Sequence, residues 1–225
     1  LNHYLKMNSI DSENPDSIRN WYEKRGDYYQ KEFEPYIKGF TFSSVLELGC
    51  GIGGFLYYLK KKDIRNFTGV DISKEELEFC RKYVTDQVIE SDAITFLKKA
   101  ESKYDLIVLY DLIEHITKKD IPEFLRLLHK ALNENGRVVV RTPNMASLTA
   151  SYSRYIDFTH ETGLTSESIT QVFSDAGFSE LSVHNSFISR KRLYLIQLLT
   201  KLIGKIYNFS PNKIVTRNLV LTALK

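Results

Sequence analysis

The sequence predicts an α/β fold: a doubly wound, mostly parallel seven-stranded sheet with helices on both faces, an antiparallel last strand and an N-terminal helical cap. Three observations lead to this prediction. Apolar strand patterns alternate with helical patterns from residue 41 onward. The segment Tyr104–Tyr110 is apolar without polar alternation, as in the middle of a parallel sheet. Between the first strand and its helix, Gly49, Gly51 and Gly54 follow the spacing G-x-G-x-x-G.

Residues 1–40 are predicted to form the cap. A helix is expected over residues 12–38, where charged side chains alternate with Trp21, Tyr22, Tyr29 and Phe33. The first six residues, which precede Met7, carry no weight in this prediction.

The main domain is expected over residues 41–225. Its first elements, in order, are a strand at 44–49, a helix at 53–61, a strand at 67–71, a helix after residue 73, a strand at 88–90 and a helix at 93–99. Ser73 is the expected N-cap of its helix, because Glu75 and Glu76 follow in the first turn, where the helix dipole favours negative charge.

The remaining elements continue the alternation. They are a strand at 104–110, a helix opening at 120–122, a strand at 137–141, a helix at 165–176, and strands at 181–187 and 214–223. Residues 133–136, Asn-Glu-Asn-Gly, are expected to cap the helix that opens at Asp120. Thr165 and Ser168 predict a capping box, and Gly177 closes the helix that they begin.

Two segments lie outside the regular alternation. Residues 142–165 are too long for a plain connection and are expected to form a lid or substrate segment. Residues 190–207 have the pattern of an amphipathic helix. Packing on the sheet or on a second subunit is the ordinary explanation for this helix, and we favour packing. The alternative is a basic helix resting on an anionic membrane.

Composition and charge narrow the class. With 225 residues, 43% apolar and 26% charged, the chain is an ordinary globular protein, and no apolar run is long enough to span a bilayer. The two cysteines, Cys50 and Cys80, do not indicate a disulfide framework, so a reducing cytoplasm is expected. Eight of the 31 basic residues and none of the 28 acidic ones lie in 181–225, so an anionic partner is expected there.

The carboxylate of Glu47 indicates which cofactor suits the glycine turn. A dinucleotide would bring a pyrophosphate beside Glu47, and the two groups would repel each other in a partly desolvated cleft. The ammonium and sulfonium groups of S-adenosylmethionine would be attracted to the same carboxylate. The turn therefore favours S-adenosylmethionine over NAD.

Acidic residues follow the second and third strands too. Asp71 comes 22 residues after Gly49, where a carboxylate can accept hydrogen bonds from two ribose hydroxyls. Asp92 follows the third strand, where it can accept from the exocyclic amine of adenine. Because ligands of such sheets bind beyond the carboxyl ends of the strands, Glu47, Asp71 and Asp92 are expected to serve one cofactor.

These motifs resemble the class I, seven-stranded S-adenosylmethionine-dependent methyltransferases over roughly residues 40–225. The segments that carry the resemblance are Glu47–Gly53, Gly69–Asp71, Ser91–Ala93, Asp105–Asp111 and Asn133–Gly136. It implies that the glycine turn holds the methionine moiety, Asp71 the ribose and Asp92 the adenine. The expected cofactor-binding residues are Glu47, Gly49, Cys50, Gly51, Gly53, Asp71, Ile72, Asp92, Ala93, Tyr110 and Asp111. The alternative is a nucleotide-binding sheet without this chemistry.

Methyl transfer to a hydroxyl needs a base, and histidine titrates near neutrality. His115 follows the fourth strand and His160 lies in the lid segment, so both are candidate catalytic residues, together with Asp157. The structural alternatives are that His115 only fixes its loop and that Asp157 and His160 form a clasp within the lid. Asp111, Glu114, His115 and His160 also resemble the metal site of magnesium-dependent relatives, but Asp111 is shorter than the glutamate found there, and we expect no metal.

The lid segment points to the acceptor. Its aromatic rings, basic donors and acid, which include Tyr152, Arg154 and Phe158, suit a sugar or glycan hydroxyl. Residues 154–161 and 173–178 are similar to bacterial methyltransferases of surface-polysaccharide biosynthesis. The sequence thus predicts O-methylation of a glycan by a cytoplasmic enzyme, which is peripheral to the inner face of the membrane if residues 190–207 bind it, and a homodimer if they pair.

Three other functions stay open from sequence alone. One is methylation of a quinone-like small molecule or an RNA 2′-hydroxyl, with or without a metal. Basic residues confined to the tail argue against RNA, and no DNA partner is expected. The second is a noncatalytic binding protein that has kept the fold. The third is an NAD-dependent dehydrogenase, which the position of Glu47 disfavours.

Overall fold

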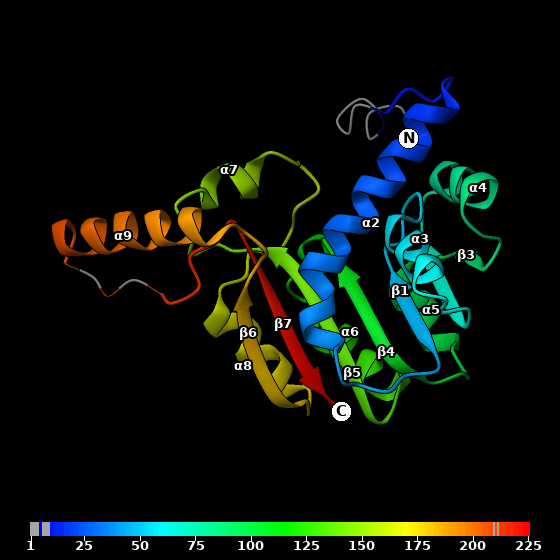
Figure 1. Ribbon diagram of the computed structural model, residues 1–225. Helices are drawn as coiled ribbons and strands as arrows, with labels where there is room; N and C mark the ends of the chain where they lie inside the picture. The colour runs from blue at the N-terminus through cyan, green and yellow to red at the C-terminus, as the bar shows by residue number, and fades with distance from the viewer. Residues whose placement is uncertain (1–4, 6–9, 209, 211) are drawn as a thin grey trace. The chain divides into compact units, whose positions relative to one another are not determined.

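The computed structural model describes residues 5, 10–208, 210 and 212–225 (Figure 1). Most of the first six residues therefore lie outside the described part of the chain. The described strands form a seven-stranded sheet of order β3-β2-β1-β4-β5-β7-β6, which confirms the predicted fold class. The chain divides into two compact units, residues 1–100 and 101–225, and each is described by itself.

The first unit begins with a long helix and continues as alternating strands and helices. Its elements are α2 (Pro15–Ile37), β1 (Val45–Leu48), α3 (Gly54–Lys61), β2 (Phe67–Asp71), α4 (Lys74–Tyr83), β3 (Val88–Glu90) and α5 (Ala93–Lys99). The three strands are parallel: β1 pairs with β2, with Val45 opposite Phe67, and β2 pairs with β3, with Gly69 opposite Val88. The predicted strands at 67–71 and 88–90 are confirmed residue by residue.

The helix α2 starts at residue 15 because the side chain of Asn14 accepts hydrogen bonds from the next two free backbone N–H groups. One side of α2 is aromatic and lies against α3. Tyr29 and Phe33 pack on the ring of Phe55, with ring centroids 5.5 and 5.1 Å apart. Phe33 and Phe55 are fully buried, so these rings form the core between α2 and α3.

The second unit carries the remaining four strands. Its elements are β4 (Tyr104–Tyr110), the 3-10 turn η1 (Ile113–His115), α6 (Ile121–Ala131), β5 (Leu132–Pro143), α7 (Ala150–Tyr155), α8 (Ser166–Asp175), β6 (Ser179–Asn185), α9 (Arg190–Ile206) and β7 (Asn218–Leu224). Strand β4 runs parallel to β5, while β7 is antiparallel to both β5 and β6. The antiparallel last strand is therefore confirmed.

One predicted helix end is wrong. Residues 133–136 do not cap α6, because α6 ends at Ala131 and β5 starts at Leu132. The Asn133 side chain instead donates a 2.7 Å hydrogen bond to Asp105. At Gly136 a side chain would lie 2.7 Å from the carbonyl oxygen of Asn133. This glycine serves a close backbone approach inside a strand, and sequence alone cannot separate that use from a cap.

The helix α8 matches its prediction. Thr165 and Ser168 form the reciprocal capping box, and Gly177 adopts a φ of 95° just after the helix.

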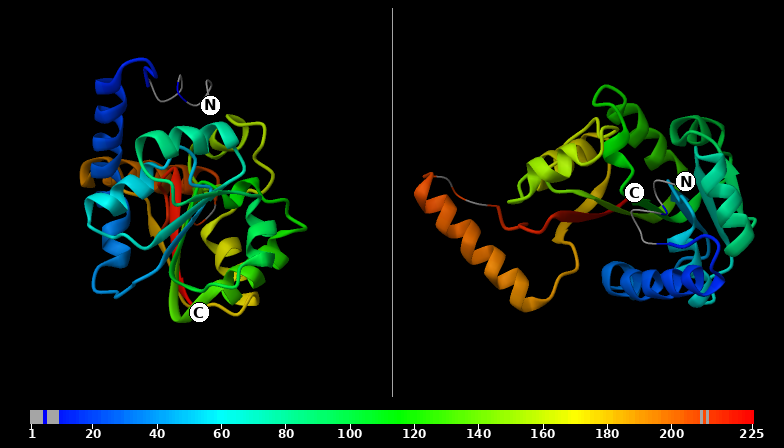
Figure 2. Two further views of the ribbon diagram at one scale, coloured as in Figure 1. Left: turned by 90° about the vertical axis from the view of Figure 1, so that its right-hand side faces the viewer. Right: turned by 90° about the horizontal axis from the view of Figure 1, so that it is seen from above.

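The helix α9 leaves its leucines exposed, and its packing on a second subunit stays a prediction. In Figure 1 and in the right-hand view of Figure 2, its C-terminal end lies farthest from β6 and β7. Among the described helices, none combines the length and the apolar character needed to cross a bilayer.

Candidate active site

The glycine turn between β1 and α3 contains three glycines with left-handed backbone, and the third is Gly53, while Gly54 of the G-x-G-x-x-G spacing is the first residue of α3. Gly49, Gly51 and Gly53 have φ values of 77°, 51° and 82°, in the region that favours glycine. The N–H groups of Gly49 and Cys50 bond to the carbonyl oxygen of Val70, at 2.8 and 3.1 Å. The turn is thus anchored to β2 at its start. Two of its N–H groups are used in this anchoring.

Close packing holds the far end of the turn. A side-chain carbon at Gly53 would lie 2.4 Å from the sulfur of Cys80 on α4. The hydroxyl of Tyr22 on α2 donates a 2.7 Å hydrogen bond to the carbonyl oxygen of Ile52. Both contacts fix where α3 begins, so the turn is rigid from its first to its last glycine.

Glu47 is a buried carboxylate without a full set of partners. It lies in β1 and is 2% exposed. Its Oε2 atom is buried and has no hydrogen-bond partner among the described residues. Burial raises the pKa of Glu47 well above its ordinary value, and the nearby charge of Asp71 raises it further. Such an oxygen fits a cationic ligand, and the ammonium of S-adenosylmethionine is one.

Asp71 connects the turn to the end of β2. Its Oδ2 accepts a 2.8 Å hydrogen bond from the N–H of Gly51, and its Oδ1 accepts one of 2.8 Å from Ser73. A carboxylate has about four lone-pair positions, so both oxygens can still accept from ribose hydroxyls. These two bonds fix the orientation of the Asp71 side chain, and its contact with the ribose stays a prediction. The N–H of Ser91 donates to the carbonyl oxygen of Asp71 and so joins the end of β3 to the end of β2.

The remaining predicted cofactor residues of this unit differ in their surroundings. Ile72 is 72% exposed directly after β2, which suits a flat apolar ligand such as adenine. Asp92 is the N-cap of α5, and its Oδ1 accepts a 2.9 Å hydrogen bond from Thr95. Its predicted contact with adenine thus competes with capping for one oxygen. Cys50 and Ala93 are buried and contribute backbone and packing.

In the second unit, the end of β4 is built around an ion pair. Asp111 has a φ of 53° and pairs through Oδ2 with Arg141 of β5. The guanidinium of Arg141 also lies over the ring of Tyr110, 4.2 Å from its centroid. The other oxygen, Oδ1, is buried without a hydrogen-bond partner among the described residues. Tyr110 and Asp111 are therefore held in place while one acceptor remains.

Glu114 is the most deeply buried acid of this unit. Its Oε2 accepts a 3.0 Å hydrogen bond from Thr142, while no described residue bonds to its buried Oε1. Burial raises the pKa of Glu114 to about 8, and the charge of Asp111 adds to the effect. The carbonyl oxygen of Glu114 accepts from the N–H groups of Glu161 and Thr162. This pair of bonds attaches the lid segment to η1.

A hydrogen-bonded chain orients His115. The Oδ1 of Asp157 accepts a 2.7 Å bond from the hydroxyl of Thr159, and that hydroxyl lies 2.9 Å from Nδ1 of His115. Because the hydroxyl proton is committed to Asp157, we assign the His115 proton to Nδ1 and the lone pair to Nε2. Burial lowers the pKa of His115, and the charge of His160 lowers it further, so the ring is neutral at pH 7.

His160 lies beside His115, with ring centroids 4.9 Å apart. Its Nδ1 is 2.9 Å from the carbonyl oxygen of Ser153 on α7, and its own carbonyl accepts from Arg154. The three predicted catalytic residues are therefore brought together. Asp157 acts on His115 through Thr159, and the expected clasp between Asp157 and His160 is limited to a 3.3 Å backbone bond.

Three of these groups could share a cation. The ligand atoms of Glu114, His115 and His160 lie within 4.8 Å of one another. One carboxylate and two imidazoles suit a divalent transition metal.

The lid segment also exposes apolar rings. Tyr152 and Tyr155 of α7 are 58% and 80% exposed, and Phe158 is fully exposed. Arg217 lies over the ring of Tyr152, and Arg154 lies over that of Tyr155. Exposed aromatic rings next to guanidinium groups can stack on an acceptor and bind its polar groups.

Sequence reasoning missed three residues of these sites. Thr159 orients His115, Arg141 pairs with Asp111, and Tyr22 holds the glycine turn. Each acts across a long sequence separation. Strand pairing brings Arg141 to Asp111, the fold of the lid segment brings Thr159 to His115, and the packing of α2 on α3 brings Tyr22 to the glycine turn.

Comparison with known proteins identifies the family of this chain. The methyltransferase domain family matches residues 18–183. A solved S-adenosylmethionine-dependent methyltransferase from Archaeoglobus fulgidus is 25% identical, with a TM-score of 0.70 over 91% of this chain and 94% of that one. Phosphoethanolamine N-methyltransferase 1 of Arabidopsis thaliana is 28% identical over 159 residues, 67% of this chain and 32% of that protein. A probable S-adenosylmethionine-dependent methyltransferase of Mycobacterium tuberculosis is 26% identical over 171 residues, 76% of this chain and 60% of its own length.

The chain spans 32% to 60% of the length of these curated relatives. The family match nevertheless covers more than half of the chain and includes the glycine turn, Asp71, Asp92, Asp111, Glu114 and both histidines. The solved relative extends the agreement to nearly the whole fold. The chain therefore belongs to the methyltransferase domain family and has the fold of S-adenosylmethionine-dependent methyltransferases.

Proposed function

We propose that the protein transfers a methyl group from S-adenosylmethionine to a hydroxyl of a sugar or glycan. The observation that carries this proposal is the hydrogen-bonded chain Asp157–Thr159–His115, which leaves a neutral imidazole with its lone pair on Nε2. A hydroxyl, unlike an amine, must lose a proton for its methyl ether to be the stable product. A neutral, oriented base is therefore the feature that an O-methyltransferase needs.

Glu47 and Asp71 are the residues expected to hold the methyl donor. The unpartnered Oε2 of Glu47 would accept from the ammonium group, and Asp71, already oriented by Gly51, would accept from the ribose. S-adenosylmethionine, when bound, supplies a methyl group attached to a positively charged sulfur. After transfer of the methyl group the sulfur is a neutral thioether. Ionised Glu47 is stabilised by that cation, which offsets the cost of its burial.

In this proposal His115 is the general base. With S-adenosylmethionine bound, Nε2 of His115 would take the proton of the acceptor hydroxyl while the methyl group passes from the sulfur to the hydroxyl oxygen. The imidazolium so formed is stabilised by Asp157 through Thr159. His160, whose ring faces His115, holds the acceptor or accepts the proton in turn. The proton finally goes to water.

The exposed side chains of the lid segment support the proposed acceptor class. The exposed rings of Tyr152, Tyr155 and Phe158 offer flat apolar faces of the kind that stack on a sugar ring. Arg154 and Arg217 stand beside two of these rings and can donate to hydroxyl or phosphate oxygens. An acceptor of this kind fits surface-polysaccharide biosynthesis at the cytoplasmic side of a membrane, and a homodimer is compatible with it.

The test is a panel of acceptors incubated with S-adenosylmethionine and followed by mass spectrometry for a gain of one methylene unit. The panel contains sugar nucleotides, oligosaccharides, a catechol, RNA and phosphoethanolamine, which the name of the plant relative suggests. We expect product with a sugar or glycan. Methylation of phosphoethanolamine or of RNA alone would contradict the proposed acceptor, and no transfer to any acceptor would support a noncatalytic binding protein.

Variants then test the base. His115→Ala should lower turnover by about 100-fold or more, because general base catalysis contributes typically 10²–10⁴-fold. His160→Ala should lower it less. The affinity for S-adenosylmethionine should remain unchanged in both, as measured by calorimetry. Full activity in His115→Ala would refute the assignment, and addition of EDTA to the wild type tests a metal at Glu114, His115 and His160.

A further inference from the structure

The helix α9 presents an apolar face to solvent. Leu195, Leu198, Leu199 and Leu202 are 51–55% exposed, and Ile206 is 68% exposed. At 3.6 residues per turn these five side chains cover an arc of about 100° of the helix surface. The opposite side contacts the rest of the unit, since Thr200 and Gly204 are buried. The helix is therefore attached along one side and uncovered on the other.

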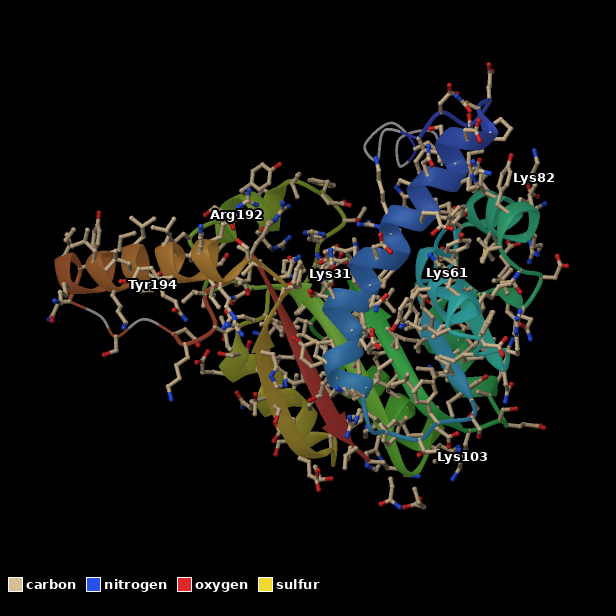
Figure 3. All side chains as sticks on the ribbon, viewed as in Figure 1. Lys31, Lys61, Lys82, Lys103, Arg192 and Tyr194 are labelled. Atoms are coloured by element: carbon tan, nitrogen blue, oxygen red, sulfur yellow. The ribbon has the colours of Figure 1, made fainter. Side chains whose placement is uncertain are left out.

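Basic residues border this face. Arg190, Lys201 and Lys205 lie along one edge of the apolar arc, Arg192 lies at the other, and Lys191 stands within it at the N-terminal end. Figure 3 labels Arg192 near that end, together with Tyr194, which is 66% exposed. No acidic residue occurs anywhere in residues 181–225. The positive charge of α9 is therefore not balanced by its own segment.

A cavity beside α9 adds a second cationic feature. It has a volume of about 450 Å³ and is lined by Gln197, Thr200 and Lys201 of α9 and by Asn212, Lys213 and Val215 of the following segment. Lys201 and Lys213 contribute two ammonium groups to this lining and Gln197 an amide. The Thr200 hydroxyl already donates to the carbonyl oxygen of Ile196, and the Asn212 amide already donates to Ser166, so the cationic character of the cavity comes from the two lysines. The Asn212 amide also contacts Glu167, so one carboxylate lies near the rim. A phosphate group is the anion that such a lining would accept.

We propose that α9 is a docking surface for an anionic phospholipid membrane. The leucines would enter the boundary between head groups and acyl chains, while the basic border and the cavity at Lys201 and Lys213 would bind lipid phosphates. An apolar face, flanking Lys and Arg residues and an exposed tyrosine, here Tyr194, are typical of a helix that lies in a membrane surface. The proposal does not depend on the identity of the methyl acceptor.

Charge argues against a second copy of the chain as the occupant. Two α9 helices packed face to face would bring ten basic side chains together without an acidic partner on either helix. An anionic lipid surface has the opposite sign and attracts each Lys or Arg near it by about 1 kcal/mol. The chemistry of the face therefore favours lipid.

The test is sedimentation of the full chain with sucrose-loaded vesicles. One set contains phosphatidylcholine only, and the other contains phosphatidylglycerol and phosphatidylcholine at one to three. We expect binding to the anionic vesicles, weaker binding to the neutral ones and a further loss at high salt, because surface charge is screened. Equal binding to both vesicle types, or none to either, would overturn the proposal.

Two double variants separate the apolar and the cationic parts. Leu198→Ser with Leu202→Ser should weaken binding by on the order of 100-fold, since each leucine contributes about 1.5–3 kcal/mol when fully buried. Lys201→Glu with Lys213→Glu should weaken it by about 30-fold or more, at about 1 kcal/mol for each lost lysine. All four residues are exposed, so melting temperatures should stay within about 2 °C.

Matched controls use exposed residues elsewhere. Ile89→Ser with Leu148→Ser removes two exposed apolar groups, and Lys118→Glu with Lys119→Glu makes the same change in net charge as the cationic double variant. Both controls should bind within twofold of the wild type. Equal losses in control and test variants would mean nonspecific adsorption. A dimer seen by sedimentation equilibrium that Leu198→Ser with Leu202→Ser dissociates, without vesicle binding by the wild type, would assign the face to a second copy instead.

Discussion

Burial shifts the pKa values of Glu47 and His115 in opposite directions, and each shift suits a different task. Burial raises the pKa of Glu47, and its Oε2 has no hydrogen-bond partner among the described residues, so a bound cation would stabilise the ionised carboxylate. Burial lowers the pKa of His115 and keeps it neutral, so the residue is ready to take a proton. At the scale of single residues, desolvation accounts for both.

The first prediction concerns the affinity of Glu47 for the methyl donor. Glu47→Gln should weaken binding of S-adenosylmethionine by about 10- to 100-fold, since hydrogen bonds to charged groups contribute about 1.5–3 kcal/mol. The free energy of unfolding of the ligand-free protein should not fall, because a buried carboxylate is removed. Calorimetric titration and urea unfolding measure the two effects. Glu78→Gln, at an exposed position of α4, is the control, and unchanged affinity in Glu47→Gln would contradict the role.

A second prediction follows from the same pKa shift. Because the pKa of Glu47 in the folded state is raised above its ordinary value of 4.5, Glu47 stays protonated to a higher pH in the folded protein than in the unfolded chain. The stability that protonated Glu47 confers is complete below pH 4.5 and is lost as pH rises through the folded-state pKa, by up to about 1.4 kcal/mol per pH unit. Urea unfolding of the ligand-free wild type from pH 5 to 9 should show this fall. The free energy of unfolding of Glu47→Gln should fall less over the same pH range. Parallel curves for the two proteins would contradict the raised pKa of Glu47.

Thr159 provides the third prediction, as a positioning residue. Thr159→Val removes the hydroxyl that links Asp157 to Nδ1 of His115. We expect kcat to fall by about tenfold while KM and the affinity for S-adenosylmethionine change little, because only the orientation of the base is lost. Thr159→Ser should restore most of the rate. Ser151→Ala, on the exposed side of α7, is the control, and an equal loss in that variant would indicate general loosening of the lid segment.

At the scale of elements, the turn between β1 and α3 requires glycine for two separate reasons. Gly53 needs both a left-handed backbone, with φ of 82°, and empty space next to Cys80. Gly39, after α2, has a similar φ of 78°, but apart from its chain neighbours no described residue has an atom within 4 Å of the position that a side-chain carbon would take. The two positions thus separate backbone strain from steric overlap.

The fourth prediction uses that contrast. Gly39→Ala should lower the free energy of unfolding by about 1 kcal/mol, the cost of a left-handed alanine. Gly53→Ala should lower it by about 2–4 kcal/mol, because overpacking adds about 1–3 kcal/mol. In a Cys80→Ala background the cost of Gly53→Ala should shrink toward that of Gly39→Ala, as measured by urea unfolding. Equal costs in both backgrounds would exclude the sulfur contact as the cause.

At the scale of the whole molecule, charge is distributed unevenly along the chain. Residues 181–225 hold eight basic side chains and no acidic ones, while residues 1–180 carry a net negative charge. The glycine turn, with buried Glu47, belongs to the acidic part, and the docking helix belongs to the basic part. A cationic small molecule and an anionic surface are therefore expected at different parts of the same chain.

The fifth prediction is a comparison of ligands on the intact protein. S-adenosylmethionine at 100 times its Kd should stabilise the folded state by about 2.7 kcal/mol and raise the melting temperature. NADH at the same concentration should leave the melting temperature unchanged, because its pyrophosphate would be repelled by Glu47. Differential scanning fluorimetry measures both. A rise with NADH and none with S-adenosylmethionine would overturn the cofactor assignment.

The sequence predicted those features of the site that depend on local backbone chemistry. The glycine-rich sequence predicted a turn with unusual backbone between β1 and α3, and Gly49, Gly51 and Gly53 have left-handed φ values there. Ser73 and Thr165 cap the helices that they were expected to cap. The prediction that Asn133–Gly136 cap α6 is wrong. The same residue types suit a helix cap and a close approach between strands, and only the packing of β5 on β4 selects the second.

By itself, the sequence determined the order of elements, the fold class and the chain positions of the acidic and histidine side chains, because hydrophobic period and turn residues are local properties. The tertiary structure decided which polar atoms lack a partner, how Thr159 joins Asp157 to His115, and that the leucines of α9 face solvent. These depend on contacts between residues far apart in the chain. A hydrophobic pattern shows that a helix has an apolar face, but what covers that face is a property of the folded molecule.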